Sequence, residues 1–148
     1  DLIKAMANIQ SHQSGGPCSL SQTAAVAAIE GAQGSVSELR QTLECNRNVL
    51  MDLLREVPGL KADTPEGTFY CFADFRAFDE DSTRLAARLL EKVQVVTVPG
   101  VEFGMEGFLR LSYCGPEEDV REGLRRIKWL LDESGGPELR AGDKVFTR

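Results

Sequence analysis

The chain has 148 residues, and its 42% hydrophobic content is that of an ordinary globular domain. Its 17 basic and 23 acidic side chains give a net charge of −6, and no run of Lys or Arg forms the basic stripe that nucleic acid or anionic lipid requires. No stretch approaches the roughly 20 apolar residues of a membrane span, and no basic-then-apolar signal opens the chain. The composition predicts a cytoplasmic protein with small-molecule and protein partners, no nucleic-acid partner and no membrane partner.

The cysteines and the histidine form no recognisable metal or disulfide pattern. The sequence contains no CxxC pair, and His12 is its one histidine. Zinc ligands and disulfide frameworks usually show closer and more regular spacing. We therefore expect four reduced thiols, at Cys18, Cys45, Cys71 and Cys114.

The first half of the chain predicts helices. Apolar residues repeat at helical spacing from Leu2 to Ile9, as if the chain began inside an element, which suggests a fragment. A polar loop is expected over residues 11–17. Ser19 with Gln22, and then Ser35 with Glu38, have capping-box spacing, so each pair predicts a helix start. The second of these helices is the clearest in the chain, and Pro58-Gly59 ends it.

The second half alternates strands and helices. Strands are expected at residues 60–62, 68–72, 94–98 and 108–113. Asp81 or Ser82 caps a helix between the second and third strands, and Pro116 opens a last helix. The order predicts an α+β fold, a two-layer sandwich with a small sheet packed against helices, over residues 1–132. Residues 133–148 are rich in Gly and Pro and predict a flexible C-terminal tail.

Arg110 is the most informative single residue. In residues 108–113, period-two alternation puts Leu109, Leu111 and Tyr113 on one face of a strand and Arg110 on the other. A guanidinium on a rigid strand can hold a carboxylate through two parallel hydrogen bonds, which a Lys cannot reproduce. The alternative is a solvated arginine on the open face of a sheet.

Two glycine-bearing turns lie beside aromatic residues at strand ends. They are Pro65-Glu66-Gly67-Thr68-Phe69-Tyr70 and Val98-Pro99-Gly100-Val101-Glu102-Phe103-Gly104. Loops held by strands are good places for binding pockets. The alternative is that Phe69 and Phe103 anchor the core and the glycines only make turns. For His12 the alternative is a simply exposed side chain, and for Cys18 it is packing as a small apolar residue.

An ordered set of motifs resembles the C-terminal third of class I/II aminotransferases, the fold-type I pyridoxal-phosphate enzymes related to aspartate aminotransferase. The set is Gln22-x-Ala24-Ala25, Pro65-x-Gly67-Thr68-Phe69-Tyr70, Val98-Pro99-Gly100-x-x-Phe103-Gly104 and Arg110-Leu111-Ser112-Tyr113. The match runs from about Asp1 to about Leu131. The resemblance implies an amino-group transfer from an amino acid to a 2-oxo acid. It also implies that Arg110 binds the substrate α-carboxylate, and that Gly67 and Phe69 border the active-site mouth.

The resemblance also implies partners and a cofactor. Pyridoxal 5′-phosphate would be bound mainly by a large domain that precedes Asp1 and carries the Schiff-base lysine, so this chain alone should be inactive. The full-length enzyme would be a homodimer, with His12, Gln13 and Ser14 as candidates for contacts with the neighbouring subunit. The stretch Cys45-Asn46-Arg47-Asn48 and the pair Gly15-Gly16 depart from the family pattern.

Two other functions stay open on the sequence. The parent enzyme could be a fold-type I lyase, decarboxylase or synthase, because such enzymes share the small domain and the carboxylate arginine. The chain could instead be a free-standing, non-catalytic α+β domain that binds a small carboxylate. A reading frame beginning near Asp1 would favour the free-standing domain.

Overall fold

The computed structural model of the chain describes residues 1–132 and 134–148. The chain divides into two compact units, Asp1–Glu38 and Leu39–Arg148. None of the helices in the described part of the chain combines the length and the apolar character of a membrane-spanning segment.

The first unit consists of helices with no buried residue. They are α1 (Leu2–Gln13), α2 (Ser19–Glu30) and the first residues of α3 (Gly34–Arg55). The expected loop start at residue 11 is wrong, because α1 continues to Gln13 while the Ser11 hydroxyl donates to the Asn8 carbonyl. Serine can satisfy its hydroxyl on the preceding turn without leaving the helix.

Neither expected capping box forms in the first unit. The N-cap of α2 is Cys18, and the Gln22 side chain donates to the Pro17 carbonyl at 2.9 Å. Helix α3 begins at Gly34, so Ser35 already lies inside the helix. The predicted helices exist, but their first turns are stabilised differently from the prediction.

The second unit is built on an antiparallel sheet in the order β1-β2-β4-β3. The strands are β1 (Lys61–Ala62), β2 (Tyr70–Asp74), β3 (Val98–Pro99) and β4 (Phe108–Ser112). Strand β2 begins two residues later than expected, because Thr68 has a φ of 62° and cannot continue a strand. The expected strand over residues 94–98 is mostly wrong, since Gln94 is the left-handed C-cap of the preceding helix.

Three helices cover one face of this sheet. The C-terminal half of α3, then α4 (Ser82–Val93) and α5 (Glu117–Leu131), bury their apolar stripes against it. Asp81, one of the two predicted caps, caps α4 by accepting from the Arg84 N–H at 2.8 Å, and Ser82 lies inside the helix. The shared core confirms the α+β two-layer fold; its members include Leu50, Leu54, Cys71, Ala73, Leu85, Leu89, Leu109, Leu111, Leu124 and Ile127.

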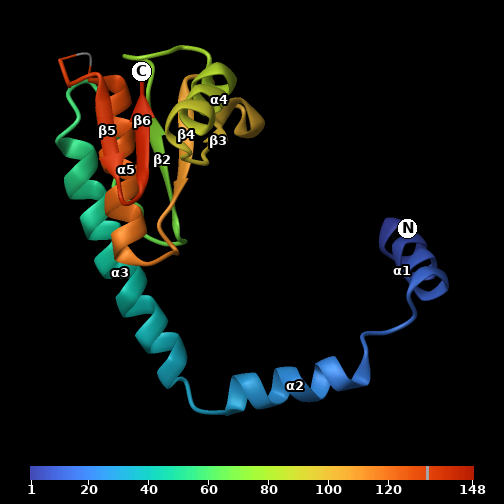
Figure 1. Ribbon diagram of the computed structural model, residues 1–148. Coiled ribbons are helices and arrows are strands. Elements are labelled where there is room, and N and C mark those ends of the chain that lie inside the picture. The colour runs from blue at the N-terminus through green and yellow to red at the C-terminus, as the bar shows by residue number, and fades with distance from the viewer. Residues whose placement is uncertain (133) are drawn as a thin grey trace. The chain divides into compact units, whose positions relative to one another are not determined.

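The flexible tail expected over residues 133–148 is wrong for residues 138–147. These form a hairpin of β5 (Glu138–Ala141) and β6 (Lys144–Thr147), with Gly142 at a φ of 57° in its turn. Figure 1 shows the hairpin beside α5, which it contacts through β5. Phe146 is buried and stacks beneath Arg126. The glycines that suggested disorder therefore serve a tight turn and a connection, while alternating apolar residues dock the hairpin.

Candidate functional site

Arg110 lies in the middle of the sheet. Its strand, β4, runs between β2 and β3, and Arg110 is opposite Phe72 on one side and Val98 on the other. Its neighbours Leu109 and Leu111 are 0% and 4% exposed on the helix-covered face, whereas Arg110 is half-buried on the opposite face. The predicted alternation along this strand is confirmed. A central strand holds the arginine backbone rigidly on both sides.

Two aromatic rings flank the Arg110 guanidinium. Its Cζ atom lies 4.2 Å from the ring centroid of Tyr70 and 4.8 Å from that of Phe103. A cation at these distances is attracted to the ring faces, and the contacts restrict the orientation of the guanidinium. A guanidinium that stacks on rings keeps its in-plane N–H groups available as donors.

The charge of Arg110 is not paired inside the second unit. Within residues 39–132 and 134–148, no carboxylate forms an ion pair with it. Asp74, on the same face of the sheet, is bound by Arg76 at 2.7 Å, and the hydrogen bond from Arg76 lowers the pKa of Asp74. Arg110 can therefore accept a carboxylate from outside without breaking an existing ion pair.

The aromatic residues continue across this face. Phe72 stacks on Phe108 with 5.4 Å between centroids and meets Phe103 edge-on at 5.8 Å. Phe69 contacts the Tyr70 ring at 4.3 Å and so reaches Arg110 only through that ring. Phe69 is 38% exposed and Phe103 is 48% exposed, so neither is a core anchor.

Gly67 lines a different hollow. This cavity measures about 340 Å³ and is also lined by Arg47 and Tyr113. Arg47 donates to the Pro65 carbonyl at 3.3 Å, and the Tyr113 hydroxyl donates to the Thr68 carbonyl at 3.1 Å. Burial raises the pKa of Tyr113. Of the predicted site residues, the structure brings Phe69 close to the Arg110 cluster and leaves Gly67 beside Arg47.

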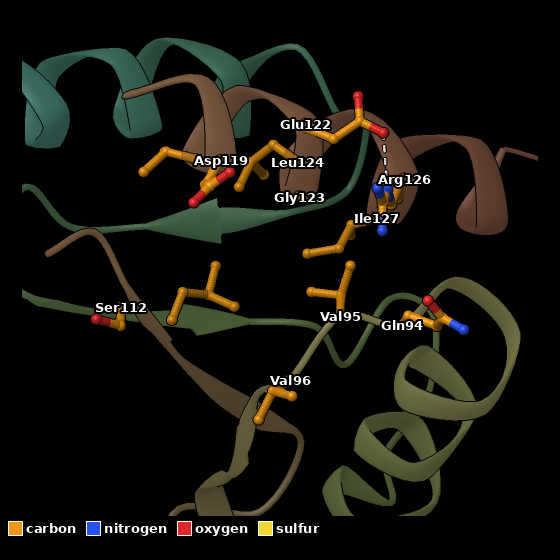
Figure 2. A pocket seen from close by; sticks show the side chains of 12 residues that line it. Gln94, Val95, Val96, Ser112, Asp119, Glu122, Gly123, Leu124, Arg126 and Ile127 are labelled. Carbon is orange, nitrogen blue, oxygen red and sulfur yellow. Dashed lines mark hydrogen bonds and ion pairs between the residues drawn. The ribbon is translucent and has the colours of Figure 1, made fainter. Parts of the chain in front are cut away.

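A further hollow of about 310 Å³ lies between α5 and the segment that precedes β3 (Figure 2). Its walls combine apolar and polar side chains, and the Glu122–Arg126 ion pair, at 2.7 Å, is among them. The hollow is lined by Leu111, from the helix-covered face, and by its strand neighbour Ser112, and Arg110 does not line it.

Sequence reasoning missed the pairing of Tyr70 and Phe103 around Arg110. The sequence motifs place Tyr70 only at the end of a turn and leave Phe103 open as a pocket or core residue. Tyr70 and Phe72 are two residues apart in β2, so alternation along the strand puts their side chains on the same face. Phe72 pairs with Arg110 in the observed register, so this is also the face of Arg110. The contact between Phe103 and Arg110 depends on the conformation of the loop around the 3-10 helix η1 (Gly100–Phe103), and no periodic sequence pattern predicts that conformation.

The fold and this cluster define an α+β domain that presents an arginine beside two aromatic rings on one face of its sheet, without an ion pair among the described residues of the second unit. The model of the family "Aminotransferase class I and II" matches residues 1–127. The chain belongs to this family. The match ends before the β5–β6 hairpin begins.

Curated relatives agree with this assignment. An aspartate aminotransferase of Streptomyces avermitilis is 38% identical over 143 residues, which cover 90% of this chain and 35% of the relative. A probable aspartate/prephenate aminotransferase of Aquifex aeolicus is 38% identical over 138 residues, with coverage of 90% and 35%. The chain therefore spans about a third of the length of the curated relatives that it matches.

Solved structures share the fold. An aspartate aminotransferase from Rhizobium meliloti matches with a TM-score of 0.78 at 35% identity, covering 86% of this chain and 34% of that protein. An aromatic aminotransferase from Pyrococcus horikoshii matches with a TM-score of 0.82 at 29% identity, covering 89% and 36%.

None of the lysines in the described part of the chain is buried. The family's cofactor, pyridoxal phosphate, forms a Schiff base with a lysine that is activated by desolvation or by neighbouring cations. Lys4, Lys61, Lys92 and Lys144 are exposed, and Lys144 donates to Gln94. Lys128 is partly exposed and pairs with Glu56 at 3.1 Å.

Proposed function

We propose that the chain is the C-terminal small domain of a pyridoxal-phosphate-dependent aminotransferase, and that Arg110 binds the substrate α-carboxylate. The observation that carries this proposal is the Arg110 guanidinium, held between Tyr70 and Phe103 on a central strand without an ion pair in the second unit. We assign the small domain to residues 1–132, with the hairpin as an addition to it.

The role of Arg110 is to bind and to orient. Two parallel hydrogen bonds from a guanidinium fix both the position and the plane of a carboxylate. Fixing the carboxylate restricts rotation about the adjacent carbon, so the amino group and the α-proton are presented in one direction. Arg110 moves no proton in this proposal, because a guanidinium stays protonated in proteins.

We propose an amino acid and a 2-oxo acid as the substrates, with aspartate as the first donor to test. The support is the names of the relatives, several of which are aspartate aminotransferases. Gly67 and Phe69 would border the mouth of the site. The aromatic residues beside Arg110 would contact the apolar part of the substrate.

We further propose that the remainder of the enzyme supplies what this chain lacks. The cofactor and its lysine would belong to a preceding large domain, and the full-length enzyme would be a homodimer in which His12, Gln13 and Ser14 contact the neighbouring subunit. The lysine environments described above support this division, and so does coverage of about a third of the relatives. The isolated chain should show no transamination when cofactor, aspartate and a 2-oxo acid are added.

The experiment is the Arg110→Lys variant of the full-length enzyme, with Arg76→Lys as the matched control. Arg76 also stacks on an aromatic ring, that of Phe108, at 5.2 Å, but it is already paired with Asp74. We expect Arg110→Lys to lower kcat/KM for aspartate by about 100-fold, because a misplaced substrate loses productive orientation. Cofactor absorbance should be unchanged. Unaltered kinetics in Arg110→Lys, or an equal loss in Arg76→Lys, would reject the role of Arg110.

A further inference from the structure

A short loop carries Phe103 to Arg110. It consists of the 3-10 helix η1 (Gly100–Phe103) and the residues that lead into β4. The loop closes on itself, since the Met105 N–H donates to the Gly100 carbonyl at 3.0 Å. A Cβ atom at Gly100 would lie 2.1 Å from the Met105 carbonyl oxygen, so only glycine permits this approach.

Two side chains fasten the loop to the start of α4. The Glu106 carboxylate accepts from the Ser82 N–H at 2.6 Å and from the Gly107 N–H at 3.2 Å. The Ser82 hydroxyl accepts in turn from the Val101 N–H at 3.3 Å. Ser82 is completely buried, so its polar groups depend on these partners. Both ends of the loop are thus hydrogen-bonded to a single residue of α4.

The Ser82–Glu106 pair also fits the electrostatics of a helix start. Asp81 already caps α4 through the Arg84 N–H, which leaves the Ser82 N–H for Glu106. A carboxylate is stabilised at the positive end of a helix. Hydrogen bonds from Ser82, and from the Gly107 N–H, hold the pKa of Glu106 below its ordinary range. Glu106 therefore accepts these hydrogen bonds as an ionised carboxylate at neutral pH.

We propose that Glu106 and Ser82 are positioning residues that hold Phe103 against Arg110, and thereby set the affinity of the site for a carboxylate. This inference rests on the proposed function of Arg110. The Phe103 side chain is half exposed, and its ring contacts are Arg110 and the edge of Phe72. A half-exposed ring on a short loop gains little from burial, so its position depends on the loop backbone. We call the hydrogen bonds of Glu106 and Ser82 the latch of this loop. Without the latch, Phe103 occupies more orientations, and Arg110 loses one of its two flanking rings.

The kinetic test uses the full-length enzyme with aspartate. Glu106→Ala removes both hydrogen bonds and should raise KM for aspartate about threefold, the scale of one partly exposed cation–π contact, with kcat nearly unchanged. Glu106→Gln keeps a neutral acceptor and should restore most of the affinity. Glu102→Ala, an exposed acid on η1, is the matched control and should leave KM unchanged.

A double-mutant cycle tests the route through Phe103. Phe103→Ala should raise KM by a similar factor, and adding Glu106→Ala to it should cause little further change, because both substitutions remove the same contact. Independent, multiplying effects would overturn the proposal. An unchanged KM in Glu106→Ala would overturn it as well.

A measurement on the chain itself separates this inference from the proposed function. The rings of Tyr70 and Phe103 should shift the NMR signal of the Arg110 side-chain N–H, and Glu106→Ala should move that signal towards the value seen in Phe103→Ala. If the signal moves but Arg110→Lys leaves catalysis intact, the latch exists and the proposed function is wrong. If Arg110→Lys abolishes activity but the signal does not move, the proposed function stands and the latch is rejected.

Discussion

The two units of the chain differ in the burial of their apolar side chains. In residues 1–38 every residue is exposed, including large apolar ones such as Leu2, Leu20 and Ile29. In residues 39–148 the helices and the sheet share a common core in which Leu89 and Leu109 are fully buried. Helix formation without burial adds little to stability, because most helical stability in proteins comes from packing. The stability of the chain therefore resides in the second unit.

The largest expected contrast between the units comes from the same substitution in each. Leu89→Ala removes a side chain that is 0% exposed and should lower the free energy of unfolding by about 3 kcal/mol, because it leaves a cavity in a packed core. Leu20→Ala changes a side chain that is 79% exposed and should alter it by less than about 0.5 kcal/mol. Urea unfolding followed by Trp129 fluorescence measures both. Equal losses would contradict the division.

A buried amide in α3 should give the next effect. Asn46 is 2% exposed and donates to the Tyr113 carbonyl at 3.0 Å and to the Gly115 carbonyl at 2.8 Å, which ties α3 to the end of the Arg110 strand. Asn46→Ala should cost about 2 kcal/mol, because the buried Tyr113 carbonyl and the more exposed Gly115 carbonyl both lose their donor. Asn48→Ala, an exposed neighbour on the same helix, should cost less than about 0.5 kcal/mol in the same unfolding experiment. A harmless Asn46→Ala would show that the tie is dispensable.

The hairpin tests whether the second unit extends to the end of the chain. Phe146→Ala should lower the free energy of unfolding by about 2 kcal/mol, less than a central core residue, because the hairpin covers only the outer side of the helices. Val145→Ala, an exposed neighbour on the same strand, is the control. Hydrogen exchange should show slower exchange of the paired amides in β5 and β6 than of the exposed amides of Gly15 and Gly16. Equally fast exchange would restore the expectation of a flexible tail.

The smallest expected effect is the pH dependence of the stability that Glu122 contributes. Hydrogen bonds from Arg125, and also from Arg126, lower the pKa of Glu122 below its ordinary value of 4.5. Folding lowers the pKa of Glu122. Its contribution to the free energy of unfolding is therefore complete above the pKa of the unfolded chain, and it is lost as the pH falls through the lower pKa of the folded chain. Glu122→Gln should cost about 0.5 kcal/mol near pH 7 and progressively less below pH 4.5. A difference from the parent chain that is the same at every pH would contradict this.

Much of the second unit could be predicted from its sequence. The helices α4 and α5, the strand around Arg110 and its alternation all follow from periodicity, because apolar stripes at a spacing of 3.6 or 2 residues must face a core. The sequence leaves the cap of α4 open between Asp81 and Ser82, and the structure shows that it is Asp81. The resemblance to aminotransferases, argued from ordered motifs, is confirmed by the family match.

The remainder depended on interactions that no local pattern encodes. The hairpin is not predicted because the glycines and the proline of residues 133–148 favour disorder on average, whereas the hairpin is held by the packing of Phe146 beneath Arg126 of α5. The shortened β3 follows from one left-handed residue, Gln94. The Tyr70–Arg110–Phe103 stack and the Glu106–Ser82 pair join segments that are separated by many residues, so only the folded chain brings them together.

The role of Arg110 is tested most directly by comparing substrates with and without the α-carboxylate. The full-length enzyme should be assayed with aspartate and with the corresponding amine that lacks the α-carboxylate, in the parent protein and in Arg110→Ala. The account predicts a strong preference for aspartate in the parent and a loss of most of that preference, by about 100-fold or more, in Arg110→Ala, since the carboxylate then has no bidentate donor. An undiminished preference in Arg110→Ala would show that another group binds the carboxylate.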